Sequence, residues 1–586
     1  MKSIPMVKKQ QKTASQKKTI NSVAESGTIK KNWHGRKSVA LIYPNTYHVG
    51  MSNLGFQTVY SQLNGFDEIV CERVFLPTTE ARNPIQLRSV ESNRILTDFN
   101  LIAFSISFEN DYLNVLTLLE KAGFPLLSTH RNNELPLVVA GGVTCFLNPE
   151  PIAPFIDAFL IGEAEEIIPS LVEGISEFSN PNIPREKRLL ELAQKIPGAY
   201  VPTFYKPNYH DDGTLASFFA TETVPSKIRS LHTFNLSLHN CYSTIITADT
   251  TFNNTFLIEV SRGCARGCRF CSAGYIYRPP RFRTHKHIEK NLLTGKAYTN
   301  RIGLVGAAVS DLPDIEKLCT DKSAEGVQIG FSSLRADALS DKLITALRSS
   351  GTKSVAIAPD AGSQRLRSVI NKGLDEEKIL AAVTALVQNN IPNIKLYFMI
   401  GLPTETNEDI NAIVALCKKI KHNFLSSSKT KGKIGEITVS LNSFVPKPFT
   451  PFQWVAMDDV KSLKYKIKQI KKVLGKVANI KIHADIPRWA FIQAILSRGD
   501  RRVAQLLLAV HKNGGNWTQA LKTVPINPLF YVQRERFKNE LLPWDFIDHG
   551  IDKSFLWKEF KRALSEMSSP PCPMDPQKCR LCGVCG

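Results

Sequence analysis

The segment FLIEVSRGCARGCRFCSAG, residues 256–274, joins a short apolar run to a cysteine-rich loop. The run FLIEV predicts a buried β-strand. The loop places Cys264, Cys268 and Cys271 in C-x3-C-x2-C spacing. Three thiolates can each bind one iron of a cubane cluster and leave the fourth iron open. A structural zinc site, the competing interpretation, normally has four ligands. The segment therefore predicts a 4Fe–4S cluster with an open coordination position.

Strand-like runs and helical patterns continue to alternate after this loop. The runs are RIGLVGAAV (301–309), VQIGFSSL (327–334), KSVAIAPD (353–360), IKLYFMIGLP (394–403) and EITVSLNSFVP (436–446). With the first strand they make six βα-type units, which predict a partial (β/α)6 barrel over residues 251–455. Active sites of such barrels lie at the C-terminal ends of the strands, where the cysteine loop also falls.

A second α/β unit is predicted over residues 38–172. Its strand-like runs are VALIYP (39–44), EIVCERVF (68–75), LIAFSISF (101–108), LPLVVAGG (135–142) and AFLIG (158–162). This pattern favours a doubly wound parallel sheet with helices on both faces. Ligands of such sheets bind beyond the carboxyl ends of the strands, here at Asn45, Ser105 and Gly141–Gly142. The glycine pair fits either a ligand close to the backbone or a simple turn.

Four further segments complete the predicted domain organisation. Residues 1–37 are rich in Lys, Gln and Ser and predict a basic disordered tail. Residues 173–250 predict a connector, residues 456–568 have the apolar spacing of a helical domain, and residues 569–586 form a cysteine-rich tail. The formal net charge of +21 fits either solvated surface or contact with nucleic acid. No apolar run is long enough to cross a bilayer and no secretory signal is evident, so the expected location is cytoplasmic.

The tail carries a second group of cysteines in C-x6-C-x2-C-x2-C spacing. They are Cys572, Cys579, Cys582 and Cys585. Four thiolates fill every position of one metal site, and the C-x2-C-x2-C run resembles ferredoxin spacing. A second iron–sulfur cluster is the favoured interpretation, with structural zinc as the alternative. Three roles remain open for this metal site: electron relay, ligation of a substrate, and attachment of the chain end to the rest of the protein.

The cysteine loop resembles the signature of the radical S-adenosylmethionine (SAM) superfamily. This resemblance implies that the open iron binds the methionine moiety of SAM, that Phe270 lies near the adenine, and that VGAAV (305–309) contacts the methionine amino group. Other segments that resemble SAM-binding parts of the family are FSSLRAD (331–337), APDAGSQRLR (358–367) and KLYFMIGLPTET (395–406). The residues that the resemblance marks as candidates for binding SAM are Phe270, Gly306, Ala307, Arg335, Asp360, Ser363 and Arg365. Salt bridges at the barrel rim are the alternative role for Arg335, Asp360 and Arg365.

Blocks along almost the whole chain resemble one family of radical SAM enzymes with an N-terminal cobalamin-binding-like domain. They are YPNTYHVGMSNLG, ERVFLP, AGGVTCFLNPEP, IGEAEE, RPPRFR, GSQRLRSVINKG, FVPKPFTPFQW, SRGDRR and LPWDFID. The D-x-H-x-x-G motif, whose histidine ligates cobalt, is absent, and His48 in NTYHVG does not match its spacing. Either cobalamin binds without a protein histidine, or the domain shapes the substrate site or binds a partner.

Three functions stay open at this point. The leading one is a radical SAM enzyme that cleaves SAM to a 5′-deoxyadenosyl radical, with cobalamin-dependent C-methylation as one outcome, and with a flavodoxin- or ferredoxin-type protein as the one-electron reductant. Methylthiolation of tRNA or a ribosomal protein is the second, although the N-terminal domain contains only Cys71 and Cys145. The third is a non-enzymatic metal-binding scaffold. RPPRFR (278–283) fits either an anionic substrate site or a rigid surface loop.

Overall fold

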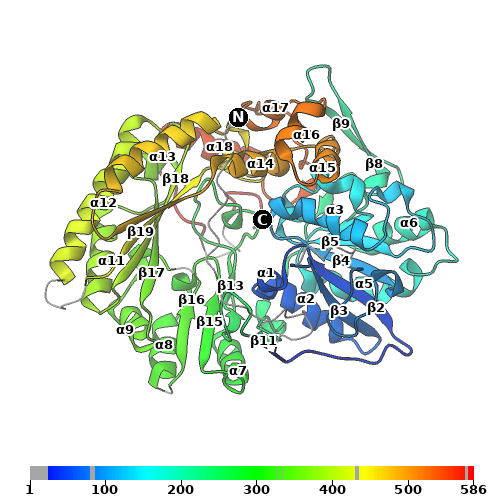
Figure 1. The fold of residues 1–586 in the computed structure, drawn as a ribbon, viewed down its shortest axis with the longest axis horizontal. Helices are drawn as coiled ribbons and strands as arrows, with labels where there is room; N and C mark the ends of the chain where they lie inside the picture. The colour runs from blue at the N-terminus through cyan, green and yellow to red at the C-terminus, as the bar shows by residue number, and fades with distance from the viewer. Residues whose placement is uncertain are drawn as a thin grey trace.

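A computed structural model describes residues 24–78, 86–324, 326–332, 334–428, 434–573 and 579–585. Two α/β units lie side by side, the N-terminal one on the right of Figure 1 and the central one on the left. Helices of the C-terminal part lie over the junction between them. The fold class predicted from the sequence is confirmed at this level.

The N-terminal unit is built on one six-stranded sheet. Its strands stand in the order β3 (Ile69–Phe75), β2 (Lys37–Tyr43), β4 (Leu101–Ser105), β5 (Leu137–Gly141), β6 (Ala158–Leu160) and β7 (Ala199–Tyr200). The first five are parallel, as predicted, and only β7 is antiparallel. Every residue of β3 is buried, which agrees with the near-continuous apolar runs of a sheet covered on both faces.

The helices of this unit cover both faces of the sheet (Figure 1). They are α1 (Tyr47–Met51), α2 (Leu54–Asn64), α3 (Tyr112–Lys121), α4 (Val143–Leu147), α5 (Ala164–Phe178) and α6 (Arg185–Lys195). Ahead of β2, residue Glu25 pairs with the buried Arg73 at 2.8 Å, and Lys31 donates to two backbone carbonyls of the unit. The prediction of disorder through residue 37 is therefore wrong for residues 24–37, while residues 1–23 lie outside the described part.

The central unit contains all six predicted strands, in two parallel sheets. The first sheet has β12 (Phe256–Glu259), β15 (Arg301–Val305) and β16 (Gln328–Phe331). The second has β17 (Ser354–Asp360), β18 (Asn393–Ile400), β19 (Ile437–Ser443) and β20 (Ile480–Ala484). The partial barrel is thus split between β16 and β17, and β20 is a seventh parallel strand. Its sequence, IKIHA, follows a lysine-rich helix whose periodicity hides the change of structure.

Helices of the central unit lie on its outer side, away from the N-terminal unit (Figure 1). They are α7 (His285–Lys296), α8 (Ile315–Ala324), α9 (Asp341–Ser349), α11 (Glu376–Gln388), α12 (Asn407–Ser428) and α13 (Val460–Leu474). The short α10 (Gln364–Val369) instead packs against a helix of the C-terminal part, residues 553–564. The prediction of a purely helical segment over 456–568 is wrong at β20 and at β21 (Ile547–Asp548). The remainder of that segment is helical, with α14 (Pro487–Arg498), α15 (Val503–Lys512), α16 (Trp517–Thr523), α17 (Pro528–Val532) and α18 (Lys553–Leu564).

Short strand pairs connect these units. The predicted connector contains the hairpin of β8 (Tyr205–Tyr209) and β9 (Leu215–Ala220). It also supplies β10 (Ile228–Arg229), which pairs with β21 (Ile547–Asp548), and β11 (Ile246–Thr247), which pairs with β1 (Glu25–Ser26). The segment predicted to be a connector therefore contributes α6 and β7 to the N-terminal unit and also pairs with residues 25–26 and 547–548.

Polar contacts hold the C-terminal helices on the N-terminal unit. Asn148 donates to the carbonyl oxygens of Ser497 and Gly499, at 3.1 and 2.7 Å. Arg501 pairs with the buried Glu150 at 3.1 Å. These residues belong to AGGVTCFLNPEP and SRGDRR, two sequence blocks more than 300 residues apart, so the two blocks meet in space and attach the C-terminal helices to the N-terminal unit.

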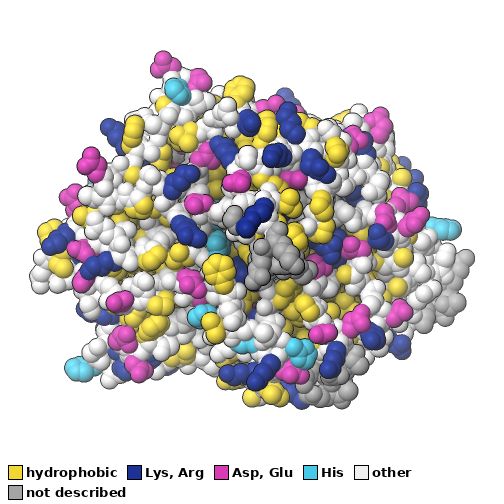
Figure 2. Space-filling model, turned by 180° about the vertical axis from the view of Figure 1, so that it is seen from behind, with side chains coloured by type: hydrophobic (Ala, Val, Ile, Leu, Met, Phe, Trp, Pro, Cys, Tyr) yellow, Lys and Arg dark blue, Asp and Glu magenta, His cyan; other side chains and the backbone are white. Residues whose placement is uncertain are grey.

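The surface carries both signs of charge. Figure 2 shows Lys and Arg side chains interspersed with Asp and Glu on the face seen from behind. In the described residues, no helix is both long and apolar enough to cross a membrane.

Candidate functional site

The cysteine loop begins where β12 ends, and neighbouring backbone and side chains hold it in place. Gly263 has a φ of +83°, and a Cβ atom there would lie 2.4 Å from the Tyr277 carbonyl oxygen, so this position requires glycine. The Gly267 carbonyl oxygen accepts hydrogen bonds from the Tyr275 hydroxyl at 3.1 Å and from Asn371 Nδ2 at 3.0 Å. The fold itself therefore sets the path of the loop.

The three thiols of the loop interact with one another. Burial raises the pKa of Cys268 to about 12, Lys372 lowers it, and the Cys271 and Cys264 thiols raise it. Burial also raises the pKa of Cys271, and Cys264 adds to this. Metal ions remove the repulsion between neighbouring thiolates. The donor set fits a 4Fe–4S cluster, in which each cysteine binds a different iron. Within the described residues, no three His, Cys, Asp or Glu side chains form a site for a single metal ion.

The arginines of the cysteine loop form ion pairs with carboxylates of other segments. Arg262, Arg266 and Arg269 lie within three residues of the loop cysteines in sequence. Arg266 pairs with Asp311 at 3.2 Å, and the fully buried Arg269 pairs with Glu559 at 3.1 Å. Arg262 also lies among carboxylates, as described below. Each charge is thus compensated within the chain, and the main effect of the arginines is to fix the loop.

Candidate SAM-binding residues gather at the carboxyl ends of the strands. Gly306 and Ala307 follow β15 directly, and the Gly306 N–H donates to Ser332 Oγ at 3.2 Å. A Cβ atom on Gly306 would lie 2.4 Å from Ser261 Oγ, so the close approach of these two segments depends on glycine. Phe270 is half-buried against an apolar cluster next to α10.

Arg335 and Asp360 both lie near the Cys268 thiol. Arg335 pairs with Asp337 at 2.9 Å, and Asp360 pairs with Lys372 at 2.5 Å. Asp360 ends β17 with a φ of +62°, an uncommon backbone conformation for a side chain other than glycine. Burial raises the pKa of Asp360, while Lys372 lowers it. Lys372 was missed in the sequence, although it stands at the end of the block GSQRLRSVINKG.

Ser363 and Arg365 already have partners in the chain. The Ser363 hydroxyl accepts from the Leu366 N–H at 3.0 Å as the N-cap of α10 and donates to Asp409. Arg365 pairs with the same Asp409, and with Glu566 at 2.9 Å. The alternative that the sequence left open, salt bridging at the rim, is what the structure shows for Arg335, Asp360 and Arg365. Their contact with SAM stays a prediction.

A cavity of about 570 Å³ lies between the N-terminal and central units. On one side it is lined by the strand ends Ser105, Gly141 and Gly142, and on the other by Gly306 and Ala307. The sequence predicted a ligand site at these strand ends, and the structure places them together on one cavity wall. Asn45 is not part of the lining, because its side chain donates to Asp111 at 2.7 Å. His48 also lies outside the lining and contacts Asp249 at 2.9 Å.

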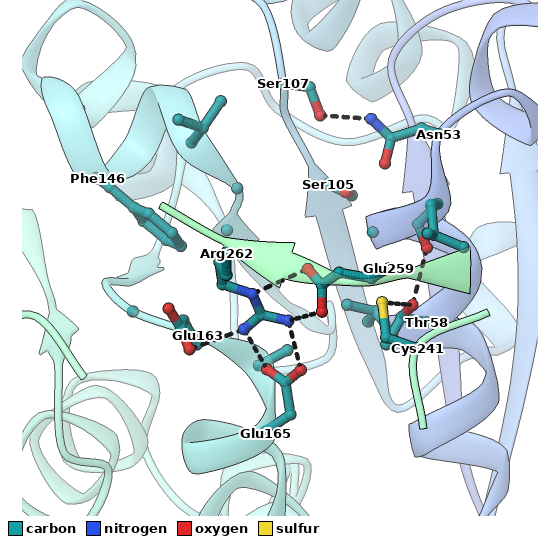
Figure 3. Close-up of a pocket in the computed structure, with 18 of the residues that line it drawn as sticks. Asn53, Thr58, Ser105, Ser107, Phe146, Glu163, Glu165, Cys241, Glu259 and Arg262 are labelled. Carbon is teal, nitrogen blue, oxygen red and sulfur yellow. Dashed lines mark hydrogen bonds and ion pairs between the residues drawn. The ribbon is translucent and has the colours of Figure 1, made fainter. Parts of the chain in front are cut away.

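Arg262 crosses the wall of this cavity from the cysteine loop to the N-terminal unit. Figure 3 shows its guanidinium group between Glu163, Glu165 and Glu259. The three ion pairs measure 2.7, 2.9 and 2.9 Å. Because Arg262 lies two residues before the first cysteine, these carboxylates connect the cavity wall to the cluster loop.

The arginines of RPPRFR take part in the same network. Arg281 pairs with Glu163 at 2.6 Å, and Arg283 pairs with Glu259 at 2.6 Å. Both guanidinium groups are almost fully buried. The two interpretations drawn from the sequence, an anionic substrate site and a surface loop, are therefore wrong for Arg281 and Arg283. No sequence signal pairs Arg281 with the IGEAEE block, because the partners are more than 90 residues apart.

The variant Glu163→Gln is expected to destabilise the folded protein by about 3–5 kcal/mol, because it leaves buried arginines without their partner. Burial would raise the pKa of Glu163, but His232, Arg262 and Arg281 lower it below its ordinary value. Such a carboxylate stabilises the fold above its unfolded pKa of about 4.3. This stabilisation is lost as the pH falls through the folded-state pKa.

Acid unfolding followed by circular dichroism from about pH 6 downward measures this effect. The free energy of unfolding should fall less steeply below about pH 4 in Glu163→Gln than in the wild type. The exposed Glu186→Gln is the matched control and should behave as the wild type. Equal acid dependence in Glu163→Gln and wild type would show that the network contributes no pH-dependent stability.

The C-terminal tail passes directly over the cysteine loop. The Cys572 N–H donates to the Ala265 carbonyl oxygen at 2.7 Å. Burial raises the pKa of Cys572 to about 11, Arg278 lowers it, and the Cys582, Cys579 and Cys585 thiols raise it. The thiols of the other three tail cysteines are thus close enough to influence Cys572, which itself lies beside the loop. The sequence predicted the tail as a metal site but had no signal for its position beside the loop.

Comparisons with known proteins match the N-terminal and central units separately. Residues 55–202 match the family described as radical SAM proteins, N-terminal, and residues 258–417 match the radical SAM superfamily. An uncharacterised protein of Methanocaldococcus jannaschii is 30% identical over 491 residues, 83% of this chain and 94% of that protein. An uncharacterised methyltransferase of Pyrococcus horikoshii is 24% identical over 234 residues, 38% of this chain and 50% of that protein. The solved structure of the radical SAM methyltransferase TsrM from Kitasatospora setae, with cobalamin and a [4Fe–4S] cluster bound, aligns with a TM-score of 0.44 and 13% identity, over 69% of this chain and 72% of TsrM.

Proposed function

The chain belongs to the radical SAM superfamily, and we propose that it produces a 5′-deoxyadenosyl radical at the cysteine loop and directs it into the cavity between its two α/β units. The observation that carries this proposal is the loop of Cys264, Cys268 and Cys271 at the carboxyl end of β12, whose flanking residues Arg262 and Gly263 line that cavity. Cys264, Cys268 and Cys271 would hold a 4Fe–4S cluster with one open iron, and such a cluster, when reduced, would supply the electron that splits the sulfonium C–S bond of SAM into methionine and this radical.

Residues of the chain would orient SAM beside the cluster. We assign the backbone of Gly306 and Ala307 to the methionine moiety, Phe270 to the adenine, and Arg335, Asp360, Ser363 and Arg365 to the ribose and carboxylate groups. Lys372, buried beside Asp360 and next to the Cys268 thiol, orients the Asp360 carboxylate through its 2.5 Å ion pair. The walls of the cavity are largely apolar. Such walls would disfavour water beside a reactive radical and so limit its side reactions.

The cavity also supports cobalamin as a second cofactor. Its N-terminal wall is the carboxyl edge of a parallel sheet, and Gly141 leaves the backbone there accessible to a flat ring. These features would let a corrin ring lie against the edge of the sheet. Cobalamin would supply methyl transfer to a substrate radical, in line with the name of the Pyrococcus relative. None of the described cavity-lining residues is a histidine, so the protein would offer cobalt no imidazole ligand.

Two other functions receive less support. Methylthiolation is the second function considered from the sequence. Enzymes of that kind resemble a pattern with three cysteines in the N-terminal domain. Here Cys71 and Cys145 are fully buried in β3 and α4 and do not line the cavity. A non-enzymatic scaffold would not need strand-end residues of the barrel gathered beside a cysteine loop. The charge distribution in Figure 2, with both signs interspersed, favours no nucleic-acid surface on that face.

The experiment that tests the proposal is anaerobic reconstitution with iron and sulfide, followed by incubation with dithionite and SAM. We expect release of 5′-deoxyadenosine, measured by chromatography and mass spectrometry. Reconstituted protein that binds the cluster but releases no 5′-deoxyadenosine would contradict the proposal.

A further prediction concerns the metal of the tail. If the four tail cysteines bind an iron–sulfur cluster, the full-length protein should contain about eight irons, and deletion of residues 570–586 should remove about half of them. Cleavage of SAM should remain measurable, because the three loop cysteines are retained. Metal analysis decides the outcome: stoichiometric zinc, with iron unchanged by the deletion, would show that the tail binds zinc.

A further inference from the structure

The start of the tail is attached to the cysteine loop by its backbone. The Cys572 N–H donates to the carbonyl oxygen of Ala265, the residue directly after Cys264, at 2.7 Å. Three residues earlier, the Ser569 N–H donates to Asn371 Oδ1 at 2.8 Å, and the Nδ2 of the same asparagine holds the loop. A path of one hydrogen bond and a few covalent bonds thus joins the first tail cysteine to the first loop cysteine. None of these contacts uses a thiol.

The other end of the tail reaches solvent. The Cys582 carbonyl oxygen accepts from the Asp552 N–H at 2.9 Å, which holds this end against the start of α18. Between the buried Cys579 and Cys582, the side chain of Leu581 is 64% exposed and Arg580 is also exposed. A protein that docks here would approach the tail thiols without entering the cavity.

The tail lies away from the substrate side of the loop. The cavity is lined by residues of the N-terminal unit, by residues 241–277 and by the segments after β15 and β16. No described residue of the tail is part of that lining. This placement disfavours substrate ligation by the tail, one of the three roles that the sequence left open. The backbone contacts already attach the tail to the loop, so attachment of the chain end does not by itself require the four thiols.

We infer that the tail cysteines hold a redox-active iron–sulfur cluster through which the electron enters the cluster at the loop, an inference that rests on the proposed function. One electron passes from a reduced flavodoxin- or ferredoxin-type protein to the tail and then to the loop. No bond forms or breaks and no proton moves in this step. The chain's net charge of +21 favours association with such acidic carriers.

The test uses the full-length double variant Cys579→Ser/Cys582→Ser, which retains the backbone contacts of Cys572 and Ser569. We expect it to lose about half of the iron of the wild type. Reduced flavodoxin should then fail to reduce the loop cluster, as followed by electron paramagnetic resonance, while dithionite, a small molecule, still reduces it. The ratio of flavodoxin-driven to dithionite-driven 5′-deoxyadenosine formation should fall accordingly. If the double variant loses all iron, Cys585→Ser, which alters the least buried tail thiol, takes its place.

The matched control is Ser569→Ala, which removes the hydroxyl that bonds to Glu559 and Arg269 but keeps the Ser569 N–H contact and all tail thiols. It should keep the full iron content. Tail zinc in the wild type, or flavodoxin reduction of the loop cluster at the wild-type rate in the cysteine variants, would overturn the inference. Failure of the proposed function looks different, since the wild type would then release no 5′-deoxyadenosine even with dithionite.

Discussion

Replacement of Cys264, Cys268 and Cys271 by alanine together is expected to abolish 5′-deoxyadenosine formation. These residues share one loop whose backbone is held independently of their thiols, by Gly263 and by the contacts to the Gly267 carbonyl oxygen. The triple variant should therefore keep its fold and lose only the metal ligands. Without three thiolates on three irons, no iron–sulfur cluster can present an open iron to SAM.

Reconstituted wild type and triple variant are compared for iron content, circular dichroism and 5′-deoxyadenosine. The variant should retain about four irons if the tail binds its own cluster. Cys417→Ala, in the buried part of α12, is the control for removing a cysteine elsewhere and should leave SAM cleavage intact. Formation of 5′-deoxyadenosine by the folded triple variant would disprove the assignment of the loop.

The variant Gly141→Trp is expected to abolish tight binding of hydroxocobalamin. Gly141 lines the cavity, and a Cβ atom added there meets only the Leu160 carbonyl oxygen at 3.7 Å, an ordinary contact. An indole at this position therefore occupies the cavity without straining the strand. Gly142 is unsuitable for the same test, because its φ is +107° and a Cβ would lie 2.4 Å from the Ile106 carbonyl oxygen.

Titration with hydroxocobalamin and absorbance spectroscopy measures this prediction. The wild type should bind with a spectrum of the base-off type, since none of the described cavity-lining residues is a histidine. Gly141→Ala adds only a methyl group and should retain binding. A wild type that binds no cobalamin, or a Gly141→Trp variant that binds it as tightly as the wild type, would leave the cavity as a substrate site alone.

The sequence alone predicted five of the six strands that the structure describes in the N-terminal sheet and six of the seven in the two central sheets. Apolar runs such as LIAFSISF and IKLYFMIGLP are local signals, because buried parallel strands need apolar residues on both faces. The strand β20 was missed because IKIHA is short and follows the lysine-rich α13, so its alternation looked like a continuation of the helix. Nothing in the local sequence predicts that residues 24–37 are ordered, because the ion pair of Glu25 with Arg73 depends on a contact between residues distant in sequence.

The sequence also predicted the chemistry of the loop. Spacing within one loop is a local property, so the C-x3-C-x2-C pattern by itself predicts three cluster ligands. Only the tertiary structure decided which groups surround them. It brought Glu163 to Arg262, Lys372 to Asp360 and the tail to Ala265. Ion pairs and hydrogen bonds of this kind join residues 12 to more than 300 positions apart, and their formation depends on how whole units pack, which no local pattern of residues encodes.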